Sequence, residues 1–137
     1  MKPVLLDTGV IVALLDRTEK RHSECVSVIE ELKQPLVTCE AVIAESCYLL
    51  RKVTGAPEAI LENVNQGIFQ IPFQLSQSAS TVRTILRKYR DIPADFADAC
   101  LIHLADILNS GEILTLDSDF HSYRWRRTHT FNLMIAS

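Results

Sequence analysis

The sequence predicts a single α/β domain, spanning residues 1–137, that is built around a mostly parallel β-sheet. Three observations support this prediction. The chain has 137 residues, which is a usual length for one domain. Hydrophobic residues make up 47% of the chain and charged residues 23%, as in folded globular proteins, so its body is not disordered. Short apolar runs alternate with longer stretches of helical spacing, and this alternation is typical of βαβ units.

The first half of the chain contains two predicted strands and three predicted helices. Residues 3–6 form a short apolar run that suits a fully buried strand, and residues 10–15 follow as a short helix. Residues 22–33 carry apolar side chains at helical spacing, and a proline ends this helix. A second apolar run at 36–38 predicts another strand. The next helix starts at residue 38 or 40 and continues to about residue 53, before a glycine.

The second half continues the same alternation. Residues 57–67 are predicted to be helical, with a proline in the first turn, and residues 68–75 to form a strand. A long amphipathic helix runs from a serine at 76 or 78 to residue 90, and another helix runs from 93 to 109. The last predicted strands lie at 112–116 and within about 127–134. In a parallel sheet of this kind, ligands bind beyond the carboxyl ends of the strands.

Composition excludes several classes of protein. The net charge of −3 argues against a protein that coats nucleic acid generally, which would be basic. No apolar run reaches the ~20 residues of a membrane helix, and the N-terminus lacks the features of a signal peptide. A cytoplasmic protein without membrane contact is therefore expected. The cysteines have neither C-x-x-C nor zinc-ligand spacing and are expected to be reduced and buried; they are Cys25, Cys39, Cys47 and Cys100.

Acidic residues occupy positions where a carboxylate is unusual. Asp7 directly follows the first predicted strand and Asp117 follows a later one, so both are expected at the same rim of the sheet. Glu45 lies in a helix that is apolar on nearly every side and is therefore expected to be buried on most sides, and Asp98 has a similar apolar flank. Asp95 lies one turn before Asp98 near a helix N-terminus, where the helix dipole stabilises a carboxylate by about 0.3–1 kcal/mol.

Each of these acids also has a purely structural interpretation. Asp7 would cap the following helix, Asp117 and Asp119 would form an acidic turn, and Glu45 would lie on a narrow solvated stripe. If the acids lie in one pocket, however, their negative charges destabilise one another, because two carboxylates about 4 Å apart repel by roughly 4 kcal/mol at an effective dielectric constant of 20. No lysine or arginine lies beside them within the apolar runs. A divalent cation resolves the conflict, and an all-oxygen ligand set favours Mg²⁺ or Mn²⁺ over Zn²⁺. The chemistry implied is metal-assisted phosphodiester hydrolysis.

Four short segments, taken in order, resemble the PIN domain family. They are LLDTGV at 5–10, AE at 44–45, ADACL at 97–101 and TLDSDF at 115–120. The resemblance covers nearly the whole chain and implies a three-layer α/β/α sandwich with a central, mostly parallel sheet. It also implies an endoribonuclease that depends on Mg²⁺ or Mn²⁺. Small members of this family are often VapC-like toxins of type II toxin–antitoxin pairs.

The resemblance also implies roles for individual residues and partners. Asp119 matches a frequent auxiliary acid that assists at the metal, and Thr8 matches a hydroxyl position beside the first aspartate. Asp95 is an additional acid that is assigned here as auxiliary. Family members commonly form homodimers and are inhibited by a cognate antitoxin protein that covers the active site, so both partners are expected beside the RNA substrate. The residues that match the catalytic, metal-binding quartet are Asp7, Glu45, Asp98 and Asp117.

A ribonuclease must also bind a polyanion, and the chain has two candidate basic clusters. Arg83 and Arg87 are four residues apart and share a face of one predicted helix. The second cluster flanks Trp125, and arginine beside an aromatic ring suits backbone contact and base stacking on single strands. The alternatives are a solvated helix face for the first cluster and a surface that packs against its own tryptophan for the second. The second cluster consists of Arg124, Arg126 and Arg127.

Three other functions compete with this interpretation. The segment LDTG at 6–9 also resembles the aspartic protease signature, but that fold is almost entirely β. A haloacid-dehalogenase-like phosphatase needs a second aspartate two residues after the first, where Gly9 stands. A catalytically silent PIN-like module that binds RNA or protein is the alternative function. Clustered carboxylates argue against it, because a protein that only binds polyanions gains nothing from them. EDTA separates the two, since it stops a metal-dependent nuclease and leaves simple RNA binding unchanged.

Overall fold

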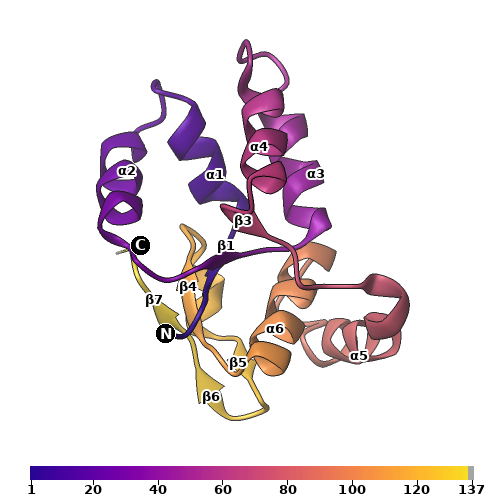
Figure 1. Ribbon diagram of the computed structural model, residues 1–137. Coiled ribbons are helices and arrows are strands. Elements are labelled where there is room, and N and C mark those ends of the chain that lie inside the picture. Colours follow the sequence, from indigo (N-terminus) through magenta and orange to yellow (C-terminus); the bar gives the residue numbers. More distant parts are fainter. Residues whose placement is uncertain (136–137) are drawn as a thin grey trace.

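Five short parallel strands form the central sheet in the order β3-β2-β1-β4-β7 (Figure 1). The computed structural model describes residues 1–135, so the predicted domain of 1–137 extends two residues beyond the described part. Val4 pairs with Leu36, and Leu5 pairs with Ile113. The predicted parallel sheet is therefore confirmed. Its strands are β1 (Val4–Leu6), β2 (Leu36–Val37), β3 (Phe69–Gln70), β4 (Glu112–Leu114) and β7 (Asn132–Leu133).

Six α-helices cover the sheet within the described residues. In Figure 1, α1 to α4 lie on one side of the strands, whereas α5 and α6 lie on the other. These layers confirm the three-layer α/β/α fold. In the described part of the chain, no helix is both long enough and apolar enough to cross a membrane. The helices are α1 (Thr8–Leu15), α2 (His22–Glu31), α3 (Glu40–Leu49), α4 (Ala56–Asn65), α5 (Leu75–Lys88) and α6 (Phe96–Leu108).

The strand order creates a switch point between β1 and β4. The chain moves outward from β1 through β2 to β3, with α1 to α4 in the connections, and α5 and α6 then return it to β4 on the other side of β1. Right-handed crossovers that progress in opposite directions place their helices on opposite faces of a sheet. The two helical layers therefore separate beyond the carboxyl ends of β1 and β4, where open α/β sheets bind their ligands.

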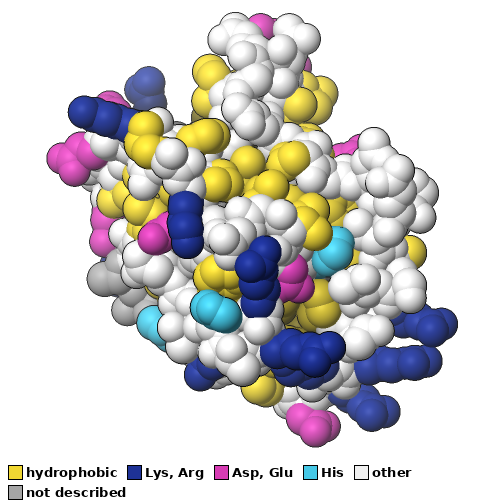
Figure 2. All heavy atoms as spheres, turned by 60° about the horizontal axis from the view of Figure 1, so that its bottom comes forward, with side chains coloured by type: hydrophobic (Ala, Val, Ile, Leu, Met, Phe, Trp, Pro, Cys, Tyr) yellow, Lys and Arg dark blue, Asp and Glu magenta, His cyan; other side chains and the backbone are white. Residues whose placement is uncertain are grey.

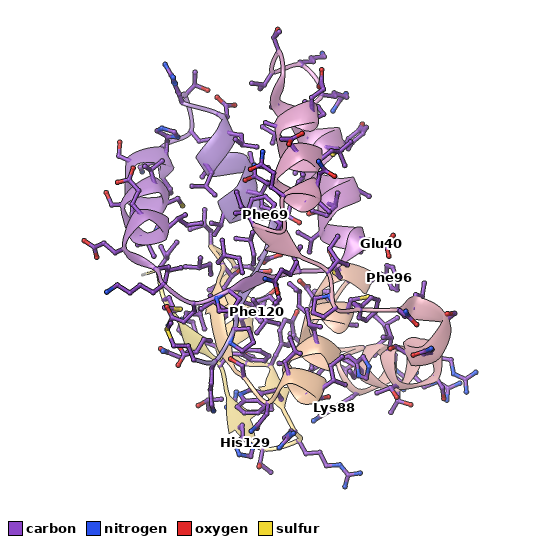
Figure 3. All side chains as sticks on the ribbon, viewed as in Figure 1. Glu40, Phe69, Lys88, Phe96, Phe120 and His129 are labelled. Atoms are coloured by element: carbon purple, nitrogen blue, oxygen red, sulfur yellow. The ribbon has the colours of Figure 1, made fainter. Side chains whose placement is uncertain are left out.

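The core holds these strand ends in place. All three residues of β1 are fully buried, and α6 is buried continuously from Ala97 to Ala105. Phe120, labelled in Figure 3, packs edge to face against Tyr123 and Phe131, with ring centroids 5.0 and 5.3 Å apart. The four cysteines are free thiols, as predicted, and Cys25, Cys39 and Cys100 are buried, whereas Cys47 is only half-buried, contrary to the prediction.

Several predicted boundaries differ from the structure. The predicted strand at 68–75 is reduced to the two residues of β3, because Pro72 has no N–H to donate to a neighbouring strand. Helix α5 starts at Leu75 after Gln74, so neither predicted serine is its N-cap. Helix α6 starts at Phe96 rather than at residue 93, because Asp95 caps it.

The C-terminal region contains a hairpin that the sequence did not predict. The single strand predicted within 127–134 is in fact β6 (His129–Thr130) followed by β7, and β5 (Arg124–Trp125) pairs antiparallel with β6. The turn between β5 and β6 places Arg126 at φ 45° and Arg127 at φ 70°. Hairpin turns with positive φ normally carry Asn or Gly, so the usual sequence signal is missing here.

Candidate active site

The switch point brings acidic side chains from distant segments together. Asp7 directly follows β1, and Asp117 lies three residues after β4. Asp98 lies in the first turn of α6, whose N-terminus is at the same edge because α6 runs back across the sheet to β4. Repulsion from Asp7 and Asp117 contributes to the raised pKa of Asp98, and repulsion from Asp117 contributes to that of Asp7. The structure thus places these three carboxylates in one electrostatic cluster.

Asp7 is buried and is fixed by two hydrogen bonds. The N–H of Thr8 donates to its Oδ1 at 2.8 Å, so Asp7 also caps α1, as its structural interpretation states. The hydroxyl of Thr115 donates to its Oδ2 at 2.7 Å. The side chain is 8% exposed, and burial raises the pKa of Asp7 to about 6 although both hydrogen bonds lower it. Asp117 and Asp95 raise this pKa further through charge repulsion.

Asp95 and Asp98 form a capping box at the start of α6. The N–H of Asp98 donates to Asp95 Oδ1 at 2.8 Å, and the N–H of Asp95 donates to Asp98 Oδ2 at 3.2 Å. The hydroxyl of Tyr123 donates to the same Asp98 oxygen at 3.3 Å. Asp98 is 7% exposed, and burial followed by repulsion from Asp95 raises the pKa of Asp98 to about 7. Asp95 itself is exposed, and its cap positions Asp98.

Thr115 connects the ends of β1 and β4. Its hydroxyl donates to Asp7 and accepts the N–H of Asp117 at 3.0 Å. Asp117 Oδ1 accepts the N–H of Asp119 at 2.9 Å and caps the short 3₁₀ helix η1 (Ser118–His121). Asp119 is half-buried at the edge of the cluster, and its charge contributes to the raised pKa of Tyr123. Neither Thr115 nor Tyr123 was predicted as a site residue.

Glu45 lies on the rim, and the expectation that its helix is buried on nearly every side is wrong. Glu45 lines an open hollow of about 410 Å³ together with Asp95 and Phe96. Figure 3 shows Glu40 and Phe96 near each other where α3 and α6 begin. Glu45 therefore faces the approach to the cluster rather than its floor. The exposed residues of α3 are Glu40, Ala44, Glu45, Tyr48 and Leu49.

The residues of the two basic clusters lie on α5 and in the β5–β6 hairpin rather than among the acidic residues. Arg83 and Arg87 are exposed on α5, while Arg126 and Arg127 form the turn of the β5–β6 hairpin. Figure 2 shows Lys and Arg side chains gathered on the face that contains the lower part of Figure 1. Trp125 is only 7% exposed, and its ring packs against His129 with centroids 4.6 Å apart. The predicted base stacking on this tryptophan is therefore wrong, since the ring is covered by its own hairpin.

The acidic cluster fits a hard divalent cation. Other carboxylates are among the main causes of the raised pKa of Asp7 and of Asp98. The hydroxyl of Thr8 is buried beside Asp7 and has no hydrogen-bond partner within residues 1–135. Within residues 1–135, no group of three or more His, Cys, Asp or Glu side chains already has the geometry of a complete metal site. An incomplete, oxygen-only set suits Mg²⁺ or Mn²⁺, because Mg²⁺ keeps several waters and takes only one or two carboxylates.

Comparison with known proteins agrees with this arrangement. The family model described as the PIN domain matches residues 4–126 of the chain. Ribonuclease VapC26 of Mycobacterium tuberculosis (strain ATCC 25618 / H37Rv) is 29% identical over 116 residues, covering 83% of this chain and 86% of that protein. The crystal structure of Mycobacterium tuberculosis VapC20, a sarcin-ricin loop cleaving toxin, has a TM-score of 0.79 at 16% identity, covering 87% of this chain and 93% of the other. This structural likeness shows the fold.

Proposed function

We propose that this chain, which belongs to the PIN domain family, is an endoribonuclease that hydrolyses RNA phosphodiester bonds and serves as the toxin of a type II toxin–antitoxin pair. The observation that carries the proposal is the cluster of Asp7, Asp98 and Asp117 at the switch point, whose carboxylates repel one another. In a protein that only bound RNA, these negative charges would weaken the binding of RNA. The similarity to ribonuclease VapC26, which covers most of both chains, supports the same activity.

The proposed cofactor is Mg²⁺ or Mn²⁺. Asp7, Asp98 and Asp117 would hold it from the floor of the site and Glu45 from the rim, with Asp119 assisting. When bound, such an ion supplies a nucleophilic water at neutral pH and offsets negative charge on the phosphodiester. Because the pKa of Asp98 is about 7, a fraction of the molecules carries a proton on this carboxyl at neutral pH, and a cation held there would favour the ionised form.

The chain's own residues prepare the site by holding carboxylates in fixed orientations. The Thr8 N–H and the Thr115 hydroxyl each bind a different oxygen of Asp7, so its carboxylate cannot rotate freely. Tyr123 and the N–H of Asp95 together fix one oxygen of Asp98. Burial of both aspartates limits competition from bulk water, which strengthens their interaction with a cation.

Thr115→Val tests this positioning. The substitution keeps the shape of the side chain and removes the hydroxyl that donates to Asp7 and accepts from Asp117. Loss of a group that orients a metal ligand typically costs about 10–100-fold in activity, so we expect RNA cleavage to fall by this factor. Thr115→Ser retains the hydroxyl and should keep most of the activity. Initial rates of both variants are compared with wild type, and equal rates for Thr115→Val and wild type would show that this hydroxyl does not position Asp7.

The direct test of the proposed function is cleavage of single-stranded RNA by the purified chain. We expect endonucleolytic products with Mg²⁺ or Mn²⁺ and intact RNA with excess EDTA. In cells, expression of the chain should arrest growth, and Asp7→Ala should relieve the arrest. Arrest that persists with Asp7→Ala contradicts a toxic nuclease activity. RNA that is bound but left intact with either ion identifies the silent RNA-binding module instead.

The proposed protein partners are a second copy of the chain and a cognate antitoxin. Large apolar side chains on α3 and α4 support a covered surface there, since Tyr48, Leu49 and Leu61 are 62%, 53% and 56% exposed. Light scattering of the purified chain tests the dimer, which should have twice the mass of 15.4 kDa. Co-purification with the product of an adjacent small gene tests the antitoxin, and its binding should inhibit cleavage.

A further inference from the structure

A second pocket, of about 230 Å³, lies between α5, α6 and the β5–β6 hairpin. Three apolar or aromatic side chains, Ile85, Tyr89 and Ile102, contribute its inner surface. Lys88, Arg124 and Arg127 add three cations. Figure 3 shows Lys88 at the end of α5 near the hairpin that carries His129. We call this site the Lys88–Arg127 pocket. The basic residues singled out on α5 from the sequence, Arg83 and Arg87, do not line it.

This pocket lies close to the acidic cluster. Asp98, Ile102 and Asp106 follow one another at intervals of four residues, so they share one face of α6. At about 1.5 Å per helical residue, Ile102 lies roughly 6 Å along α6 from Asp98. The rings of Tyr89 and Tyr123 pack edge to face with centroids 5.0 Å apart, and the Tyr123 hydroxyl donates to Asp98. One continuous wall of two tyrosines therefore separates the pocket from the carboxylates.

The backbone of the hairpin turn is strained, and the strained turn places the Arg127 side chain at the pocket. Arg126 and Arg127 both have positive φ, a region in which side chains other than those of Asn and Asp are uncommon. Asp106 fixes the turn to α6, because its carboxylate accepts the N–H of Arg126 and its carbonyl accepts Arg126 Nε at 3.2 Å. Glycine would relax this turn but would leave the pocket without the Arg127 guanidinium. Strained residues of this kind are concentrated at functional sites.

The charges and the lining together fit one class of ligand. The Nζ of Lys88 lies 5.2 Å from the centroid of the Tyr89 ring, so a cation and an aromatic ring are already adjacent. The acidic residue of the lining, Asp106, is engaged by the hairpin backbone. A flat, apolar base suits the inner surface, and phosphates suit the cations around it. Proteins that bind single-stranded nucleic acid combine these same two elements.

We propose that the Lys88–Arg127 pocket binds one nucleotide of single-stranded RNA beside the scissile bond, with its base inside the pocket and its phosphates on the three cations. This inference rests on the proposed function, because the acidic cluster on the other side of the tyrosine wall is where the strand would be cut. The pocket then fixes the register of the strand next to the cleaved bond.

The first test is RNA binding under conditions that separate it from cleavage. Fluorescence anisotropy measures binding of a labelled 15-nucleotide oligouridylate in EDTA, and a gel confirms that the strand stays intact. We compare the double variant Lys88→Ala/Arg127→Ala with Arg51→Ala/Lys52→Ala, which removes the same charge from the turn between α3 and α4, at the opposite end of the molecule in Figure 1.

We expect the pocket variant to bind about tenfold or more weakly and the control to bind like wild type. The slope of log K against log salt should fall by about 1.4 in the pocket variant, since each phosphate contact on a single strand contributes about 0.7. Equal binding by the two double variants overturns the proposal. If the wild-type protein does not cleave RNA but its RNA binding still depends on Lys88 and Arg127, the proposed enzymatic function is overturned and the proposed binding pocket is retained.

Two further probes identify what occupies the pocket. An abasic strand of the same length should bind more weakly than oligouridylate to wild type and equally to the pocket variant. Equal binding of both strands by wild type shows that only the backbone is held and overturns the base site. A 15-residue polyglutamate should bind more weakly than RNA. Polyglutamate that binds as tightly as RNA and depends on the same cations identifies an acidic peptide as the ligand and overturns the assignment to RNA.

Arg127→Gly separates a functional role of the turn from a structural one. The substitution relieves positive φ and removes one cation, so we expect the melting temperature to rise by about 3 °C while RNA binding weakens. A fall in the melting temperature together with unchanged RNA binding would show that Arg127 serves the hairpin alone.

Discussion

Asp98→Asn should lower RNA cleavage by about 10³-fold or more while the fold remains intact. A cation at the acidic cluster supplies several kcal/mol of charge stabilisation, and each 1.4 kcal/mol corresponds to a tenfold change in rate. Asp98 is one of the two most buried carboxylates of the cluster, so asparagine weakens the site from its floor. The amide oxygen can still accept a hydrogen bond from Tyr123 or from the N–H of Asp95, which preserves the start of α6.

The matched control for this substitution is Glu62→Gln. Glu62 is an exposed carboxylate on α4 whose side chain accepts a hydrogen bond from Gln66, so the change removes one charge outside the site. Cleavage rates of both variants are measured with Mn²⁺, and circular dichroism checks the fold. Activity of Asp98→Asn within a few-fold of wild type would remove this residue from the catalytic set. Thermal unfolding at about pH 8 gives a second readout, because the neutral amide should be at least as stable there as the ionised carboxylate.

The second large effect concerns stability, which should fall as pH rises when divalent cations are absent. We expect the free energy of unfolding to drop by about 3 kcal/mol between about pH 5.5 and about pH 8, which corresponds to a melting temperature lower by roughly 5–10 °C. The cause is the raised pKa of Asp7, about 6, and of Asp98, about 7.

The sign follows from proton binding by the two states. In the unfolded chain both carboxyls return to the ordinary pKa of 3.8, so they are ionised above about pH 5. The folded chain holds protons on Asp7 and Asp98 up to about pH 6 and 7, and therefore binds more protons than the unfolded chain in this window. Rising pH removes those protons and leaves buried, mutually repelling charges. Stability from this source is thus present at the acidic end and lost as pH rises through the folded pKa values.

The double variant Asp7→Asn/Asp98→Asn provides the control, because it removes both groups and keeps every histidine. Burial lowers the pKa of His103, and this effect is common to both proteins and cancels in the comparison. The pH dependence should flatten in the double variant. Addition of Mn²⁺ at about pH 8 should stabilise the wild-type protein by about 2.7 kcal/mol at a hundredfold excess over Kd. The same addition should leave the stability of the double variant unchanged. Parallel pH profiles for the two proteins would show that the cluster does not repel as described.

The sequence predicted that Asp7 and Asp117 lie at the same edge of the sheet, because the geometry of parallel strands makes this inference strong. The carboxyl ends of neighbouring parallel strands meet at one edge, so residues that follow two such strands must lie close together. Asp98 could be predicted for a related reason, since a carboxylate between long apolar runs on a helix is unusual. The direct bond from Thr115 to Asp7 spans 108 positions in sequence, and no local pattern announces it.

Glu45 and the hairpin show where sequence reasoning fails. Apolar residues surround the axis of α3, yet Tyr48 and Leu49 are exposed, because an apolar side chain does not reveal whether the core or solvent covers it. The hairpin was missed because Arg126 and Arg127 occupy positions where Asn or Gly normally marks a turn. Departures of this kind are expected at functional sites, where local preference yields to the position of a side chain.

Anomalous diffraction from crystals grown with Mn²⁺ tests the central claim most directly. We expect a peak at the switch point within coordination distance, about 2.0–2.6 Å, of the carboxylates of Asp7 and Asp98, with Asp117 contributing directly or through water. Crystals of Asp98→Asn grown in the same way should show a weaker peak or none. A manganese peak elsewhere on the molecule, with Asp7 and Asp98 still bonded only to Thr115, Tyr123 and the backbone, would contradict a shared cation at this site.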